Sequence, residues 1–111
     1  MEPCDALNRG DVFWCKFPTT DRRRPVVILS RDWAIERLTW ITVAPVTSAV
    51  RLGPVFVDVS LEDGLFEDSV VNCDRLVTVP KAELGEFVTV LSQTKMAAVE
   101  HAVRFALGLA G

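Results

Sequence analysis

The 111-residue sequence predicts a small, mostly β domain: an antiparallel barrel or sheet with one face covered by a single C-terminal helix. Three observations predict this class. Six or seven short strand-like segments follow one another at turn spacing. Only the last segment of the chain repeats its apolar residues at helical spacing. Half of the residues are hydrophobic and 24% are charged, which is typical of a globular domain and too apolar for a disordered chain.

Strand-like segments make up most of the chain after a short tail at residues 1–8. Each is either a continuous apolar run, as in Val26-Val27-Ile28-Leu29, or an alternation of apolar and polar residues. Turn signals such as Asp63-Gly64 separate them. Residues 31–38 have a weak signal that allows one or two helical turns or an irregular crossing. The expected strands are residues 10–17, 25–30, 39–46, 54–60, 69–73, 75–79 and 86–90.

The C-terminal segment is the clearest element. Ser92 fits the N-cap position of a helix, and Gly108 fits its stop. Between them, apolar residues recur at helical spacing and form one face: Met96, Val99, Val103 and Leu107. The sequence therefore predicts an amphipathic helix packed on the strands, within a single domain over residues 9–111.

Charge, cysteine spacing and hydrophobic run lengths argue against a generally basic nucleic-acid binder, a disulfide-rich or zinc-binding protein, and a membrane protein. The net charge is −3, so any binding of nucleic acid must be local, and Arg22-Arg23-Arg24 is the densest positive cluster. Cys4, Cys15 and Cys73 lack metal-site or disulfide spacing, and the last two fit buried apolar positions. Apolar runs fall far short of the ~20 residues of a membrane helix. The N-terminus lacks a signal-peptide pattern, so we expect a cytoplasmic protein.

Groups for metal or cofactor chemistry are missing from the sequence. His101 is the only histidine, and it lies in the expected helix, where it is more simply a surface residue. The aspartates have no loop-like ligand spacing, and no glycine-rich phosphate loop or nucleophile elbow can be assembled. We therefore expect neither a metal nor a cofactor.

Internal transesterification of RNA is one reaction that needs neither a histidine base nor a metal. The 2′-hydroxyl is the nucleophile, and the protein only positions groups and stabilises charge. Arg24 could grip the scissile phosphate, Thr47 or Ser48 could hold its oxygen, and Asp74 could act as base. On spacing alone, a structural explanation of the same residues is simpler. Arg24 would belong to a solvated loop, Thr47 and Ser48 to a turn at the end of a strand, and Asp74 to a hairpin.

Four motifs, in order along the chain, resemble those of the MazF/PemK family of toxins. They are Arg9-Gly10-Asp11-Val12-Phe13-Trp14, Arg23-Arg24-Pro25-Val26-Val27-Ile28-Leu29-Ser30, Val43-Ala44-Pro45-Val46-Thr47-Ser48 and the segment Asp68 to Val79. Each is weak alone, but the collinear match extends over about residues 9–109, and Leu84-Gly85 precedes a similar terminal helix. The resemblance implies an SH3-like barrel with a C-terminal helix, the PemK/CcdB-like fold, usually as a homodimer.

The same resemblance implies a metal-independent endoribonuclease that cleaves single-stranded RNA, stops growth and is neutralised by a cognate antitoxin protein. Arg24 and Thr47 match positions where the family places catalytic or phosphate-contacting groups. Asp74 matches an acidic position that some members use as base. Further residues expected to bind RNA are Arg22, Arg23, Ser48, Ser69, Asn72 and Arg75.

The chain departs from the family pattern at three places. The first loop, Pro18 to Arg23, is short and has no clear counterpart of the acidic loop residue of typical members. Asn72 stands where some members have a second arginine, and Arg75 where a glutamine is common. These differences concern acid–base roles and sequence specificity more than the class of reaction.

Two other functions are compatible with such a fold. One is a CcdB-like toxin that poisons a protein such as DNA gyrase, which would need a C-terminal hydrophobic anchor that residues 105–109 do not clearly form. The other is a non-catalytic SH3-like binding module. The Arg24/Thr47 pair favours the endoribonuclease over the binding module.

Overall fold

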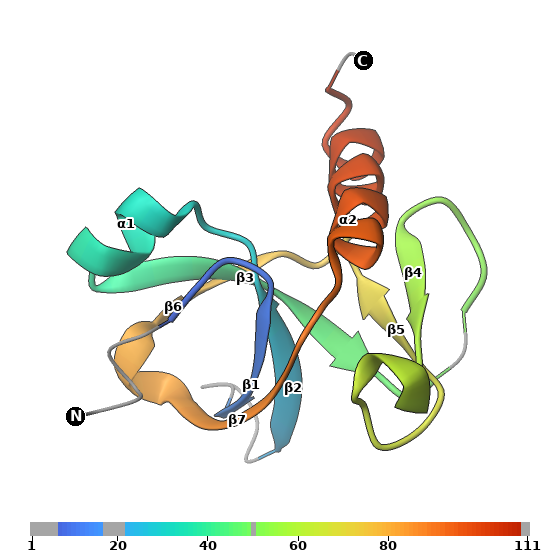
Figure 1. Cartoon of the computed structure of the whole chain (residues 1–111). Coiled ribbons are helices and arrows are strands. Elements are labelled where there is room, and N and C mark those ends of the chain that lie inside the picture. The colour runs from blue at the N-terminus through green and yellow to red at the C-terminus, as the bar shows by residue number, and fades with distance from the viewer. Residues whose placement is uncertain (1–6, 17–21, 50, 110–111) are drawn as a thin grey trace.

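The computed structural model describes residues 7–16, 22–49 and 51–109. Within these ranges, seven antiparallel strands form one sheet, with one short helix and one long C-terminal helix (Figure 1). The elements are β1 (Asp11–Lys16), β2 (Arg23–Ile28), α1 (Asp32–Arg37), β3 (Trp40–Thr47), β4 (Phe56–Val59), the 3-10 helix η2 (Leu61–Asp63), β5 (Ser69–Asn72), β6 (Val77–Pro80), the 3-10 helix η3 (Lys81–Glu83), β7 (Leu84–Val90) and α2 (Gln93–Ala106). None of the helices in these ranges is long and apolar enough to cross a membrane.

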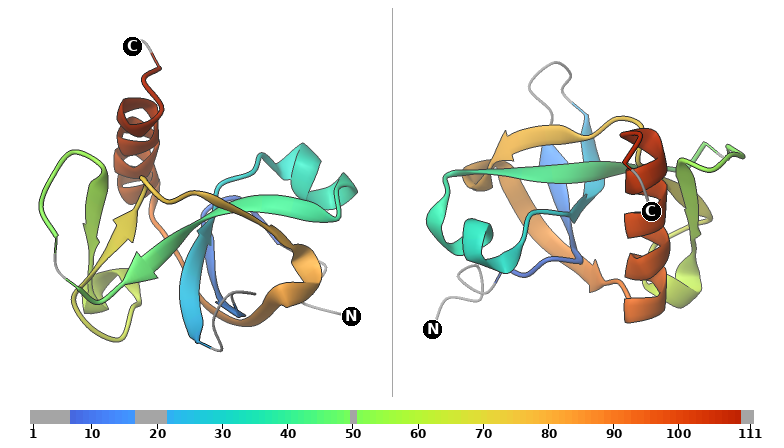
Figure 2. Two further views of the ribbon diagram at one scale, coloured as in Figure 1. Left: turned by 180° about the vertical axis from the view of Figure 1, so that it is seen from behind. Right: turned by 90° about the horizontal axis from the view of Figure 1, so that it is seen from above.

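β3 is the strand on which the sheet is built. One of its edges pairs with β2, while the other pairs with β6 at its start and with β5 at its end. The strand order is β4-β5-β3-β2-β1-β7, with β6 beside β3. The sheet is open in this path and curls strongly, and α2 lies beside β4 and β5 in both views of Figure 2. The predicted mostly β fold with a C-terminal helix is confirmed.

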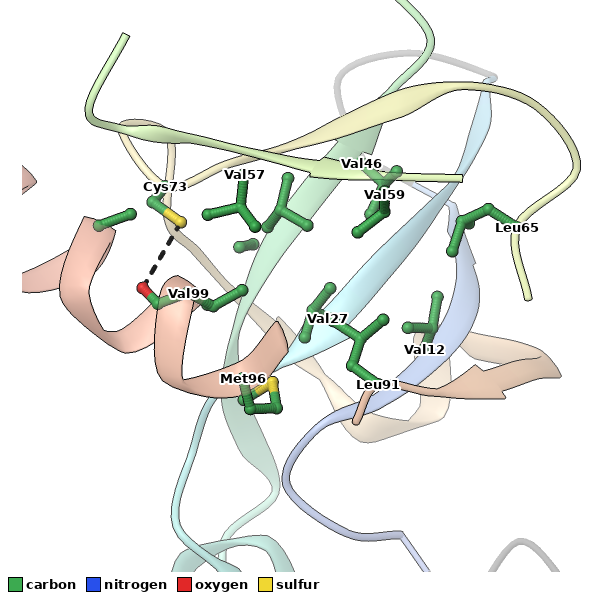
Figure 3. Packing of buried hydrophobic residues seen from close by; sticks show 13 residues of the cluster. Val12, Val27, Val46, Val57, Val59, Leu65, Cys73, Leu91, Met96 and Val99 are labelled. Atoms are coloured by element: carbon green, nitrogen blue, oxygen red, sulfur yellow. Dashed lines mark hydrogen bonds between the residues drawn. The ribbon is translucent and has the colours of Figure 1, made fainter. Parts of the chain in front are cut away.

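Both faces of the β1–β2 hairpin are buried. Val12 and Val27 belong to a core under α2 with Met96 and Val99 (Figure 3), while Phe13 belongs to a second core. Successive strand residues point to opposite faces. A strand buried on both faces therefore reads as a continuous apolar run, which is the pattern seen at residues 26–29.

Residues 9–11 fix the start of β1. The Arg9 guanidinium forms a 2.7 Å ion pair with Glu100 of α2 and donates a 3.0 Å hydrogen bond to the carbonyl of Leu29. The Asp11 carboxylate accepts a 2.9 Å hydrogen bond from the backbone of Asn8. Burial raises the pKa of Asp11, although that hydrogen bond acts to lower it. This motif joins the hairpin to the helix and is structural.

The helix α2 follows the prediction at its start and differs at its end. Ser92 accepts a 3.1 Å hydrogen bond from the backbone N–H of Lys95, as expected of an N-cap. Leu107 lies beyond the last helical residue and is 58% exposed, so its expected place on the packed face is wrong. Ala102 fills that face instead. The reason is that the helix ends at Ala106, one residue before Leu107.

Cys15 and Cys73 are fully buried, as the sequence predicted, while Cys4 lies outside the described residues. Burial raises the pKa of both thiols, that of Cys73 to about 11. The Cys73 thiol points to the carbonyl of Val99 at 3.9 Å (Figure 3). Thiols with such pKa values stay protonated at neutral pH and are poor nucleophiles.

The turn after η2 has a strict requirement for glycine, which predicts a large stability loss in Gly64→Ala. Gly64 has φ +96°, and a Cβ there would lie 2.6 Å from the Cβ of Thr89. Gly108 has φ +70° but nothing within 4 Å of its Cβ position. We expect Gly108→Ala to lower the free energy of unfolding by about 1 kcal/mol from backbone strain alone. Gly64→Ala adds overpacking and should cost roughly 1–3 kcal/mol more.

Urea unfolding of both variants and the parent chain measures the difference. Equal losses in the two variants would mean that the space around Gly64 relaxes freely, contrary to the packing described.

Candidate functional site

A cleft of about 350 Å³ opens where the first residues of β2 meet the last residues of β3. Strands and one loop contribute to it, and most of the predicted site residues are in its wall. The lining residues are Trp14, Arg22, Arg23, Arg24, Pro25, Val46, Thr47, Ser48, Leu65, Phe66, Glu67 and Ser69.

The strand register explains why Arg24 and Thr47 meet. β2 and β3 pair Val26 with Pro45, and the same antiparallel register continued by two residues sets Arg24 opposite Thr47. Residues directly opposite each other in an antiparallel pair have their side chains on the same face, with Cβ atoms about 4.5–5.5 Å apart. Two residues 23 positions apart in the sequence therefore become neighbours in the cleft wall.

The two strand arginines have different surroundings. Arg23 lies 3.6 Å from the carboxylate of Glu86, and its guanidinium is 5.9 Å from the ring centre of Trp14. Within the described part of the chain, no hydrogen bond or ion pair involves the guanidinium of Arg24, which is half-buried. An arginine with unused donors in a cleft suits a phosphate, because its planar fork binds two phosphate oxygens at once.

The prediction that Arg23 ends a loop is wrong. β2 begins at Arg23, two residues earlier than expected, because β1 continues to pair with it as far as Lys16 opposite Arg23. This pairing holds the backbone of both strand arginines in the sheet. Their positions are thus set by the hairpin.

Hydroxyl groups lie beside the arginines in the cleft lining. Thr47 ends β3, and its Oγ1 accepts a 3.3 Å hydrogen bond from the backbone of Ala49. β3 pairs Thr47 with Val70 of β5, so the residues next to these, Ser48 and Ser69, lie at the same end of this pair, and both line the cleft. The Ser69 hydroxyl is largely buried and donates a 3.0 Å hydrogen bond to the carbonyl of Glu67.

Three predicted residues do not line this cleft: Asn72, Asp74 and Arg75. Asn72 is at the opposite end of β5 from Ser69, and the other two follow it in the turn toward β6. The Asn72 side chain accepts a 3.0 Å hydrogen bond from the backbone of Asp74, as in a tight polar turn. The assignment of Asp74 as base stays a prediction that this placement does not favour.

Three further cleft residues were not among the predicted site residues. Glu67 is the carboxylate residue in the described lining, and Phe66 and Trp14 are the aromatic ones. Phe66 and Glu67 lie in an irregular segment between η2 and β5, where no periodicity predicts side-chain direction. Trp14 lies in the expected strand at residues 10–17, but the ring it stacks on, Phe66, comes from this distant segment.

Metal ligands do not gather in the described residues. No group of three or more His, Cys, Asp or Glu side chains in those ranges could hold a metal ion. His101 is exposed on α2, as expected of a surface residue. The arrangement at the cleft is cations, hydroxyls, one carboxylate and two stacked rings, which suits a phosphodiester better than a metal.

A family model for the PemK-like, MazF-like toxin of type II toxin–antitoxin systems matches residues 8–107. The chain belongs to this family. Endoribonuclease MazF3 of Mycobacterium tuberculosis is 38% identical over 89 residues, which are 80% of this chain and 86% of that protein.

Solved structures of family members have the same fold. The Mycobacterium tuberculosis toxin MazF-mt6 superposes with a TM-score of 0.83 at 34% identity and covers 91% of this chain and 99% of its own. An endoribonuclease in complex with its cognate antitoxin from Mycobacterial species gives a TM-score of 0.86 at 26% identity, covering 96% of this chain and 99% of its own.

Proposed function

We propose that this chain is the toxin of a type II toxin–antitoxin pair and acts as an endoribonuclease on single-stranded RNA, which stops translation and growth. The observation that supports this most directly is that Arg24, whose guanidinium has no partner among the described residues, lines the same cleft as Thr47. Family membership and a relative named as an endoribonuclease support the reaction class. The relatives named above give no support to the gyrase-poison or binding-module alternatives.

The reaction is an internal transesterification. A base removes the proton of the 2′-hydroxyl, whose oxygen attacks the adjacent phosphorus while the bond from phosphorus to the 5′-oxygen breaks. The leaving oxygen takes up a proton, so the products have a 2′,3′-cyclic phosphate and a 5′-hydroxyl. Arg24 stabilises the extra negative charge on the phosphoryl oxygens of the transition state, and Thr47 donates a neutral hydrogen bond to one of them.

Glu67 is our first candidate for the base. Its backbone carbonyl is held by Ser69, and its side chain lines the same cleft as Arg24. A base must reach the proton it removes, so position comes before any other property. Asp74 is the second candidate, supported by the family resemblance and not by its place in the fold.

We also propose a homodimer. A groove of about 630 Å³ runs between α2 and the sheet, and its apolar lining includes Leu29, Leu76, Val99, Val103 and Leu109. Leu109 is 54% exposed. Exposed apolar side chains at a groove are typical of interaction sites, and a two-fold interface would cover Leu109 and the charged residues around it, Arg9, Arg31, Glu100 and Arg104.

A cognate antitoxin is the second protein partner that we propose. The relative solved with its antitoxin supports it, and an acidic segment of such a partner could pair with the cleft arginines. An RNA substrate and the two reduced, buried cysteines support a cytoplasmic site of action.

The first prediction for this function concerns the products. Purified protein should cut a long single-stranded RNA in excess EDTA and leave 2′,3′-cyclic phosphate and 5′-hydroxyl ends, mapped by end-specific ligation. A 2′-O-methyl group on the nucleotide 5′ of the cut should prevent cleavage, because it removes the nucleophile. Products with 5′-phosphate ends, or a strict need for magnesium, would refute the mechanism.

The second prediction concerns Arg24. Arg24→Ala should fold normally, since the side chain has no partner in the described residues, yet lose about 100- to 1,000-fold in cleavage rate. Thr47→Ala should lose less, because a neutral hydroxyl is the weaker donor. Arg37→Ala, an exposed arginine on α1, is the matched control and should cleave normally. Full activity of a folded Arg24→Ala protein would contradict the assignment.

The third prediction separates the two candidate bases. Glu67→Gln should lower the cleavage rate by about 100-fold or more, the usual contribution of a general base, while Asp74→Asn should cleave at nearly the parent rate. A larger loss in Asp74→Asn would assign the base to Asp74.

The fourth prediction concerns assembly. Light scattering should give twice the chain mass of 12.3 kDa at micromolar concentration. Leu109→Glu should shift the protein toward the monomer, because it introduces a charge into the groove. Leu52→Glu changes a leucine that is more exposed than Leu109 and lies outside both clefts, and this variant should remain dimeric. A monomeric, fully active parent protein is the opposing result.

A further inference from the structure

The aromatic pair in the cleft has a geometry that the proposed reaction does not use. Trp14 and Phe66 are stacked, with ring centres 5.7 Å apart and planes 16° from parallel. At this separation parallel rings are offset, so each leaves part of a face uncovered. Phe66 is 63% exposed, although a phenylalanine in a small domain is usually buried.

Phe66 is held in this exposed position by its neighbours on both sides. Leu65 is almost fully buried in the core under α2, and Ser69 bonds the carbonyl of Glu67. The segment is therefore anchored before and after the ring. An exposed ring presented by an anchored loop, in the wall of a cleft, is a feature of binding surfaces.

Charge at the same place indicates the ligand. The Arg23 guanidinium lies 5.9 Å from the ring centre of Trp14, and Arg24 is in the same wall. Stacked aromatic rings beside arginines are how proteins bind unpaired nucleotides, with bases on the rings and phosphates on the cations. At about 350 Å³ the cleft has room for a nucleotide.

We propose that the Trp14–Phe66 pair is a stacking site for one unpaired base next to the scissile phosphate. Arg23 holds the phosphate that follows this base, while Arg24 and Thr47 hold the one that reacts. A base must leave its neighbours in the RNA before it can stack on these rings. Because this is easier in a single strand than in a duplex, the site accounts for a preference for single-stranded RNA. This inference rests on the proposed function, since it assigns a base subsite to the same cleft.

The test uses binding rather than cleavage. The probe is a single-stranded RNA containing the mapped cut sequence, with a 2′-O-methyl group that blocks the reaction. Phe66→Leu should weaken its binding roughly 5- to 150-fold, the effect of losing one stacked base, and Phe66→Trp should restore it. Phe87→Leu is the matched control: Phe87 is also exposed and also contacts another ring, that of Phe13, but lies outside the cleft.

Removing the base instead of the ring gives a second measurement. In a scan of single abasic nucleotides, one position next to the cut should weaken binding to the parent protein. The same abasic probe should cause no further loss in Phe66→Leu, because ring and base act as one pair. In a Trp33→Phe, Trp40→Phe background, Trp14 is the only tryptophan left, and its fluorescence should fall when the probe binds.

The outcomes separate this inference from the proposed function. A parent protein that neither binds nor cuts RNA overturns both. A parent that cuts RNA, with equal binding by Phe66→Leu and Phe87→Leu, overturns the stacking site and leaves the endoribonuclease intact. Unchanged Trp14 fluorescence on binding of the probe also overturns the stacking site.

Discussion

The pairing of β3 along both of its edges is the constraint on which the site depends. Its register with β2, continued to the strand ends, aligns Arg24 with Thr47, and its register with β5, continued by one residue, aligns Ser48 with Ser69. A slip of one residue in either pairing would turn these side chains to the other face of the sheet. The slip is prevented because β2 and β3 bury alternate residues in two cores, and both cores would lose their packing.

The positions of Arg24 and Thr47 are set by paired strands. Backbone hydrogen bonds hold the strand ends, and the ion pair of Arg9 with Glu100 joins the hairpin to the helix that covers the first core. Pre-positioned donors stabilise a transition state without reorganisation when the charge develops. Such pre-positioned donors suit a reaction whose nucleophile is supplied by the substrate, because the protein then has only to stabilise charge and remove a proton.

The sequence predicted elements well where periodicity was strong and poorly where it was absent. Alternation and the N-cap at Ser92 located the strands and α2, because both depend on local patterns. Arg24 and Thr47 were found through motif resemblance, and the fold brings them together. Asp74 was assigned from its match to an acidic position of the family, but it follows the far end of β5 from Ser69, and β5 rises about 3.3 Å per residue. Phe66 and Glu67 had no local signal at all.

The charge of the molecule fits a substrate held at one place. With a net charge of −3, the protein as a whole repels a polyanion, so affinity must come from the few cations of the cleft. A small number of phosphate contacts gives a shallow salt dependence and little discrimination between sequences. Discrimination then requires contacts with bases, and Trp14 and Phe66 are the aromatic rings that the described cleft offers for them. Stacking on these rings would add affinity that salt does not weaken. It would also favour RNA in which the base is unpaired and can unstack from its neighbours.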